Sequence, residues 1–190
     1  MIDLARWGLG VDYPIRVSSG GGRYRYKDDW QTPDTQAVTI DFNNNTSIVW
    51  EGRSCNDHQI EGSSVGVIFY GETGSLVILG NAFVVYDIAN KVVKEVTSEY
   101  IIDSLDFMNP TENLDEVHIR NFLDSVRKKT NVNADILGGY KSSLLCQLGN
   151  IALRTGNTLH IDPSNGHIKN DPAALKYWSR EYQAGWEPKI

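Results

Sequence analysis

The chain has 190 residues, of which 41% are hydrophobic and 22% are charged, and its 18 basic and 24 acidic side chains give a formal net charge of −6. This length and composition are ordinary for one soluble globular domain, so we expect residues 1–190 to form a single domain. The pI near 5.2 argues against a nucleic-acid-binding protein, which carries a basic face and a high pI. The longest mostly apolar stretches are too short to span a membrane.

The first ten residues have the pattern of the end of a helix, with Leu4 and Trp7 on one side and Gly10 as the stop. Because no cap or turn precedes this helix, we expect that it was cut from a longer one. No basic segment followed by an apolar one begins the chain, so no signal peptide is predicted. We expect a cytoplasmic location; a periplasmic one stays open, since a signal would lie upstream of Met1.

Alternating apolar and polar residues predict six or seven strands between Pro14 and about Thr97. The first is expected to run from Ile15 through three glycines to Tyr26. The others are expected at 37–42, 47–51, 65–70, 76–79, 83–87 and 92–96. Since no helix separates them, a largely antiparallel sheet is predicted.

The chain after residue 97 has helical spacing. One helix is predicted around Ile119–Val126, a second around Leu144–Thr155 with Gly156 as its stop, and a short third helix from Asp171. Strands followed by helices predict an α+β fold, in which one open sheet of about six or more strands has helices packed on one face. Because the later strands are apolar on both sides, we expect the other face to be covered by a second subunit.

The glycine run Gly20–Gly22 is not predicted to be a phosphate loop. A phosphate loop needs glycines before a helix N-terminus, whereas a strand pattern follows this run. A bulge or a close backbone approach is the better interpretation. The chain has no dinucleotide fingerprint, so no cofactor-binding residue is predicted.

Metal and disulfide sites are not expected either. The histidines have no partners at metal-ligand spacing; they are His58, His118, His160 and His167. Cys55 and Cys146 predict two buried thiols in a reducing compartment rather than a disulfide. The loop Lys27–Thr35 combines charges with an aromatic side chain, and it is either a polyol or sugar site or a solvated loop.

Several stretches together resemble the C-terminal domain of the glucose–fructose oxidoreductase / inositol dehydrogenase (Gfo/Idh/MocA) family. They are Asp3–Trp7 with Gly10–Pro14, Gly21–Tyr24 with Lys27–Asp29 and Thr32–Thr35, Phe69–Leu76, His118–Asp124, and Leu148–Ala152. The resemblance covers essentially the whole chain. It implies an NAD(P)-dependent oxidation or reduction at a sugar or cyclitol hydroxyl; some members use the same hydride removal to cleave glycosides.

Family members join an N-terminal Rossmann domain, which carries the nucleotide fingerprint and a catalytic lysine, to a sheet domain that completes the substrate pocket and commonly forms the oligomer interface. The resemblance implies that the Rossmann domain is absent here and that the catalytic histidine would fall before Met1. No catalytic residue is therefore expected in this chain, and NAD(P) is expected only for the full-length enzyme. The resemblance implies Asp3, Tyr140 and Lys141 as substrate-binding residues, and Lys27 of the loop Lys27–Thr35 is expected to bind substrate with them.

Whether the chain is an enzyme by itself stays open on these grounds. The leading hypothesis is a substrate-binding and oligomerisation domain that is inactive alone. The alternative is a stand-alone, non-enzymatic module that assembles or binds sugar. The expected partners are a sugar or cyclitol and further copies of this chain, without nucleic acid or membrane.

Overall fold

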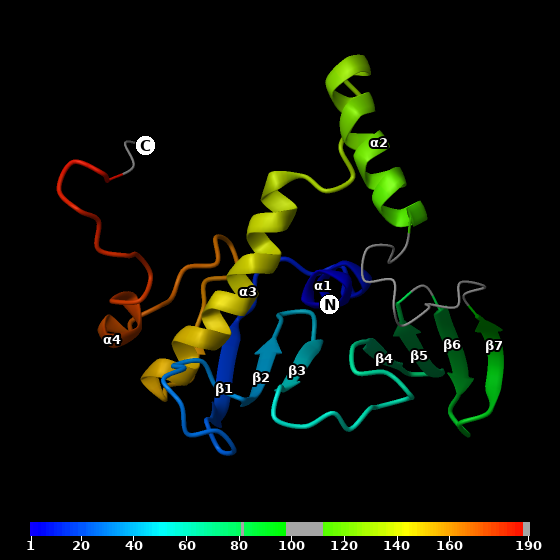
Figure 1. Ribbon diagram of the computed structural model, residues 1–190, viewed down its shortest axis with the longest axis horizontal. Coiled ribbons are helices and arrows are strands. Elements are labelled where there is room, and N and C mark those ends of the chain that lie inside the picture. Colours follow the sequence, from blue (N-terminus) through cyan, green and yellow to red (C-terminus); the bar gives the residue numbers. More distant parts are fainter. Residues whose placement is uncertain (81, 98–111, 188–190) are drawn as a thin grey trace. The chain divides into compact units, whose positions relative to one another are not determined.

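The computed structural model describes residues 1–80, 82–97 and 112–187 (Figure 1). The chain divides into two compact units. The terminal unit comprises Ile2–His58 and Lys141–Ile190, and the central unit comprises Gln59–Tyr140. Each unit contains one four-stranded antiparallel sheet.

The terminal unit is built around the sheet β3-β2-β1-β8. The core of this sheet includes Val17, Ile40 and Leu159, all fully buried. Its elements are α1 (Ile2–Leu9), β1 (Arg16–Gly22), β2 (Thr35–Asp41), β3 (Ser47–Arg53), most of α3 (Ile136–Thr155), β8 (Leu159–His160) and α4 (Pro172–Leu175). Alternation along β2 sends Val38 and Ile40 into the core, as the period-two pattern predicted.

Helix α3 packs on this sheet where it crosses β2 (Figure 1). A Cβ atom at Gly149 would lie 3.0 Å from Cγ1 of Val38, so the helix backbone approaches the strand as closely as a glycine permits. Leu145 and Leu148 are fully buried on the same helix. The predicted helix cover on one face of this sheet is confirmed.

Both predicted glycine stops are confirmed. Gly10 ends α1 at φ +63° and Gly156 ends α3 at φ +69°, a left-handed backbone that glycine adopts without steric cost. At the end of α1, the amide of Gly10 donates to the carbonyl of Trp7 (3.1 Å) and that of Val11 to the carbonyl of Arg6 (3.2 Å). This pair of bonds is a Schellman motif, and it turns the chain sharply after the helix.

The sheet of the central unit is apolar on both faces, as predicted. Its strands are β4 (Val67–Gly71), β5 (Gly74–Leu79), β6 (Ala82–Asp87) and β7 (Val92–Val96), and α2 (Glu112–Lys128) belongs to the same unit. The register aligns Phe69, Leu76 and Val85 on one face, and Ile68, Val77 and Val84 on the other. None of the helices in the described ranges is long and apolar enough to cross a membrane.

Two details differ from the sequence prediction. The antiparallel α+β class is confirmed, but in the described ranges the strands form two open four-stranded sheets instead of one. The segment between β3 and β4 folds into a turn, closed by a bridge between Ile60 and Ser63, and does not extend the first sheet. In addition, β1 ends at Gly22, because the next amides bind a side chain and leave the strand ladder.

We expect Leu145→Ala to lower the free energy of unfolding by about 2–5 kcal/mol, since it opens a cavity in the fully buried contact between α3 and the sheet. Leu137→Ala, at a position that is 53% exposed on the same helix, is the matched control. Urea unfolding followed by circular dichroism measures both. Equal losses for the two variants would contradict the packing described here.

Candidate functional site

Arg6 lies at the centre of a polar cluster formed by Asp3, Arg6, Asp12, Lys141 and Ser142. Its Nε donates to Oγ of Ser142 (2.8 Å) and its Nη1 to Oδ1 of Asp12 (3.2 Å). Its Nη2 lies 3.5 Å from Oδ1 of Asp3, and that same oxygen accepts from the Ser142 hydroxyl. Only 13% of the Arg6 side chain is exposed, so these partners hold a mostly buried cation.

Local geometry explains how the cluster assembles. Asp3 and Arg6 are three residues apart on α1 and therefore lie on the same side of the helix. The Schellman turn after Gly10 then brings Asp12 back to the Arg6 guanidinium. Ser142 and Lys141 come from α3, so the cluster ties α1 to α3.

Lys141 is held on the other side of Asp12. Its Nζ donates to Oδ2 of Asp12 (2.6 Å) and lies 5.4 Å from the centre of the Tyr13 ring, within the range of a cation–π contact. Its side chain is 15% exposed. Lys141 therefore fixes Asp12 and neutralises its charge.

Asp3 is the most accessible member of the cluster, ahead of Asp12 at 58% exposure. Its side chain is 69% exposed. Ser142 and Arg6 both bind Oδ1, and none of the described residues binds Oδ2. A carboxylate oxygen in this state accepts hydrogen bonds from hydroxyl groups. The geometry therefore suits Asp3 for holding a hydroxyl-bearing ligand.

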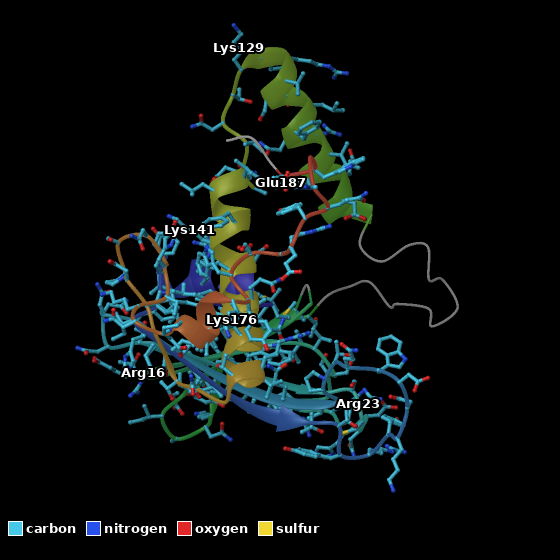
Figure 2. All side chains as sticks on the ribbon, turned by 90° about the vertical axis from the view of Figure 1, so that its left-hand side faces the viewer. Arg16, Arg23, Lys129, Lys141, Lys176 and Glu187 are labelled. Carbon is cyan, nitrogen blue, oxygen red and sulfur yellow. The ribbon has the colours of Figure 1, made fainter. Side chains whose placement is uncertain are left out.

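The structure brings two of the four implied site residues into one cluster. Asp3 and Lys141 share the polar cluster. Tyr140 directly precedes Lys141 on α3 and is 44% exposed, but it belongs to the central unit. Lys27 is exposed in the loop after β1. Seven strand residues, about 20 Å of chain, separate the two ends of β1, and Figure 2 shows Lys141 and Arg23 well apart.

Asp34, which the sequence analysis did not single out, organises the loop after β1. Its buried carboxylate accepts from the backbone amides of Tyr24 (3.2 Å), Arg25 (3.0 Å) and Tyr26 (3.3 Å), and from the hydroxyl of Thr35 (2.9 Å). Burial raises the pKa of Asp34, but these hydrogen bonds outweigh it and lower the pKa to about 2. The predicted strand at Tyr24–Tyr26 is wrong for this reason.

The same loop encloses a shallow, open depression of about 270 Å³. Its lining residues are Arg23, Tyr26, Asp28, Trp30, Thr32, Pro33 and Ser54. The guanidinium of Arg23 donates from Nη1 to the carbonyl of Thr32 (2.9 Å) and forms an ion pair with Asp28. This depression lies at the opposite end of β1 from Arg16 (Figure 2).

The glycine run Gly20–Gly22 does not fit a dinucleotide phosphate. A Cβ at Gly21 would lie 2.2 Å from the carbonyl oxygen of Thr35, which confirms the predicted close backbone approach. The amides that follow the run already bind Asp34, so they are not free for an anion. Over the described ranges, no group of three His, Cys, Asp or Glu residues is arranged to hold a metal.

A family model described as "Oxidoreductase family, C-terminal alpha/beta domain" matches residues 80–188, more than half of the chain. The chain belongs to the Gfo/Idh/MocA oxidoreductase family. This confirms the resemblance that the sequence motifs indicated. No curated protein matches the chain.

Solved structures of oxidoreductases share the fold of this Gfo/Idh/MocA chain. An oxidoreductase from Agrobacterium radiobacter, in complex with NAD+, L-tartaric acid and magnesium, is 14% identical, with a TM-score of 0.60 over 84% of this chain and 46% of that one. The WlbA dehydrogenase from Bordetella pertussis, in complex with NADH and UDP-GlcNAcA, is 16% identical (TM-score 0.55, 85% and 44%). The UDP-N-acetylglucosamine 3-dehydrogenase GnnA from Acidithiobacillus ferrooxidans is 14% identical (TM-score 0.58, 81% and 44%). The chain thus spans less than half of each of these proteins.

The sequence analysis missed the partners that orient Asp3. The three-residue spacing of Asp3 and Arg6 was a usable signal, because oppositely charged residues at that spacing pair on helices. Ser142 gave no such signal, since it lies 139 residues from the carboxylate that it binds. The prediction of two buried thiols is wrong, because Cys146 is exposed on α3 and Cys55 is only half-buried; both cysteines are free, as predicted.

Arg6→Ala is expected to lower the free energy of unfolding by about 1–3 kcal/mol, because it leaves Ser142 and Asp3 without their charged partner and Asp12 with Lys141 alone. Arg16→Ala is the matched control. It removes an exposed ion pair with Asp41 and should cost less than about 1 kcal/mol. Denaturant titrations of both variants measure the difference, and a larger loss for Arg16→Ala would refute the central role of Arg6.

Asp34→Asn should remove a pH-dependent part of the stability. The folded-state pKa of Asp34 is about 2, below its ordinary value of 3.8, so its contribution is fully present above about pH 4 and is lost as the pH falls toward 2. The stability difference between native protein and Asp34→Asn should therefore grow from pH 2 to pH 4 and then stay constant. Urea unfolding across this range measures it.

Asp29→Asn is the control for that titration, because it removes a charge from an exposed position of the same loop and leaves the Asp34 hydrogen bonds in place. A difference between native protein and Asp34→Asn that does not change between pH 2 and pH 4 would contradict the assigned role of Asp34.

Proposed function

We propose that this chain is the substrate-binding domain of an NAD(P)-dependent oxidoreductase that acts on a sugar or cyclitol hydroxyl, and that it is inactive alone. The observation that carries the proposal is the exposed carboxylate of Asp3, held in place by Arg6 and Ser142. Residues 1–190 would then act as one substrate-side domain. The nucleotide would be bound by a separate Rossmann domain of the enzyme.

Family membership and the names of similar structures support the substrate class. WlbA was solved with NADH and UDP-GlcNAcA, and GnnA is named as a dehydrogenase of UDP-N-acetylglucosamine. The ligand named for WlbA and the substrate named for GnnA are both nucleotide sugars, which carry several hydroxyl groups. A carboxylate that accepts hydroxyl hydrogen bonds is the feature of this chain that suits such a substrate.

Within this proposal, Asp3 binds a sugar hydroxyl through its unbound oxygen, and Lys141 keeps Asp12 neutralised beside it. Tyr140, which belongs to the central unit and is exposed at the preceding position of α3, is proposed as a separate substrate-binding residue and not as part of the Asp3 site. Lys27 is left out of this site, because it lies beyond the other end of β1. Hydride transfer also needs an acid–base group within reach of the reacting hydroxyl, which the remainder of the enzyme would supply.

The proposal predicts that the chain binds a sugar but not NAD(H). Calorimetry against hexoses, hexosamines and cyclitols should give a saturable heat for at least one of them. Asp3→Asn should weaken that binding about tenfold or more, the loss expected for a hydrogen bond to a charged acceptor. Asp41→Asn, a carboxylate at the end of β2 that is paired with Arg16, is the control and should bind normally.

Cofactor binding is tested with the tryptophan fluorescence of the same protein. Micromolar NADH should leave the emission unquenched after correction for absorption. Quenching that saturates with NADH would contradict the proposal that the nucleotide site lies elsewhere.

A second candidate function is assembly without catalysis, and the two apolar faces of the central sheet favour it. Tyr70 in β4 is 84% exposed and Val93 in β7 is 66% exposed. A sheet that is apolar on both faces is normally covered on both. Copies of this chain are the proposed cover, which is also consistent with a role as the oligomerisation domain of the enzyme.

Light scattering should therefore give the mass of a dimer or a larger species at micromolar concentration. Tyr70→Asp should shift the mass toward the monomer, since it places a charge on the proposed interface. Tyr24→Asp, which changes a side chain that is 73% exposed in the terminal unit, should leave the mass unchanged. A native protein that stays monomeric at high concentration would exclude this function.

A further inference from the structure

We infer that the depression in the loop after β1 binds one pyranose ring of a neutral saccharide, at a site separate from the polar cluster. Trp30 and Tyr26 form its aromatic part, and Arg23, Asp28 and Ser54 form its polar part. The inference goes beyond the proposed function, because it assigns a second binding site to a different surface of the terminal unit.

The aromatic side chains are the first argument. Trp30 is 70% exposed and Tyr26 is 43% exposed, although both are large and partly apolar. The face of an aromatic ring carries partial negative charge, so it attracts the partially positive C–H groups that line one side of a pyranose. Two exposed aromatic side chains beside a depression are therefore suited to hold a sugar ring by its apolar side.

The polar lining supplies donors and acceptors for sugar hydroxyls. Nη1 and Nη2 of Arg23 each bind one partner within the loop and each carry a second N–H that can donate to a ligand, whereas the Nε of Arg23 is buried. Asp28 accepts from Arg23 and, through Oδ1, from the amide of Trp30 (3.1 Å). Each carboxylate oxygen accepts more than one hydrogen bond, so Asp28 retains capacity for a ligand hydroxyl.

Charge decides between a neutral sugar and an anion. Arg23 and Asp28 are the only charged residues of the lining, and they pair with each other. The depression therefore carries no net charge to attract a phosphate or a carboxylate. A ligand with hydroxyl groups and no charge fits this lining best.

The loop is organised before any ligand binds. The buried carboxylate of Asp34 holds the amides of Tyr24, Arg25 and Tyr26, and the hydroxyl of Ser54 donates to the carbonyl of Asp34 (3.3 Å). Because these bonds already fix the backbone under the aromatic side chains, less conformational entropy is lost on binding. A shallow site can then still bind measurably.

Size limits the ligand to one ring. The depression measures about 270 Å³, below the range of about 300–1,000 Å³ for pockets that enclose drug-sized ligands. A single pyranose fits such a space, with the rest of a longer saccharide lying in solvent.

The test uses the full chain with three neutral probes: methyl β-D-glucopyranoside, methyl β-D-galactopyranoside and N-acetylglucosamine. Saturation-transfer NMR and calorimetry should show saturable binding of at least one probe. Trp30→Ala and Asp28→Asn should each weaken it about tenfold or more. Trp7→Ala, which removes a tryptophan that is 76% exposed on α1, should not change it, and circular dichroism should show that all variants are folded.

The same variants separate this site from that of the proposed function. Binding that survives Asp3→Asn and is lost in Trp30→Ala and Asp28→Asn supports the inference. Binding that is lost in Asp3→Asn and survives the two loop variants belongs to the polar cluster and overturns it. The inference also fails if no probe binds, or if glucose 6-phosphate or adenosine binds at the loop more tightly than the neutral sugars.

Discussion

The close approach of α3 to β2 at Gly149 is the constraint on which the terminal unit depends. A Cβ at this position would meet Cγ1 of Val38 at 3.0 Å, and Nε2 of Gln36 also reaches the carbonyl of Gly149 at 3.5 Å. A larger side chain would push the helix off the sheet. Since Ser142 lies two turns earlier on the same helix, such a shift would also move the partner of Asp3.

Strand β1 separates two surfaces of different chemistry. Before the strand, Asp12 belongs to a cluster of paired charges in which Asp3 is the most exposed carboxylate. After the strand, Arg23 belongs to a loop in which aromatic side chains surround a single ion pair. About 20 Å of extended chain lies between them, so one small ligand cannot contact both. A substitution on either surface therefore tests that surface alone.

Features that depend on neighbours in the sequence were predictable, and features that depend on distant residues were not. The helix stops at Gly10 and Gly156 and the positions of the strands after residue 36 follow from local backbone preferences and the period-two pattern, and they are confirmed. Asp34, by contrast, removes Tyr24–Tyr26 from a strand by binding amides eight to ten residues earlier. Likewise, the period-two pattern predicts strands but does not determine whether consecutive hairpins join one sheet or two.

The orientation of the Asp3 carboxylate is set by its pairing with the mostly buried Arg6 guanidinium. A guanidinium that is 13% exposed must be paired, because an unpaired buried charge is costly. The Arg6 guanidinium is paired with Asp12, Ser142 and Oδ1 of Asp3, and Oδ2 of Asp3 is left without a partner among the described residues. The carboxylate is thus held in one orientation by interactions that stabilise the fold. Binding of a hydroxyl-bearing ligand there costs little additional conformational entropy of the Asp3 side chain. The packing of α1 against α3 therefore also preorganises the candidate site.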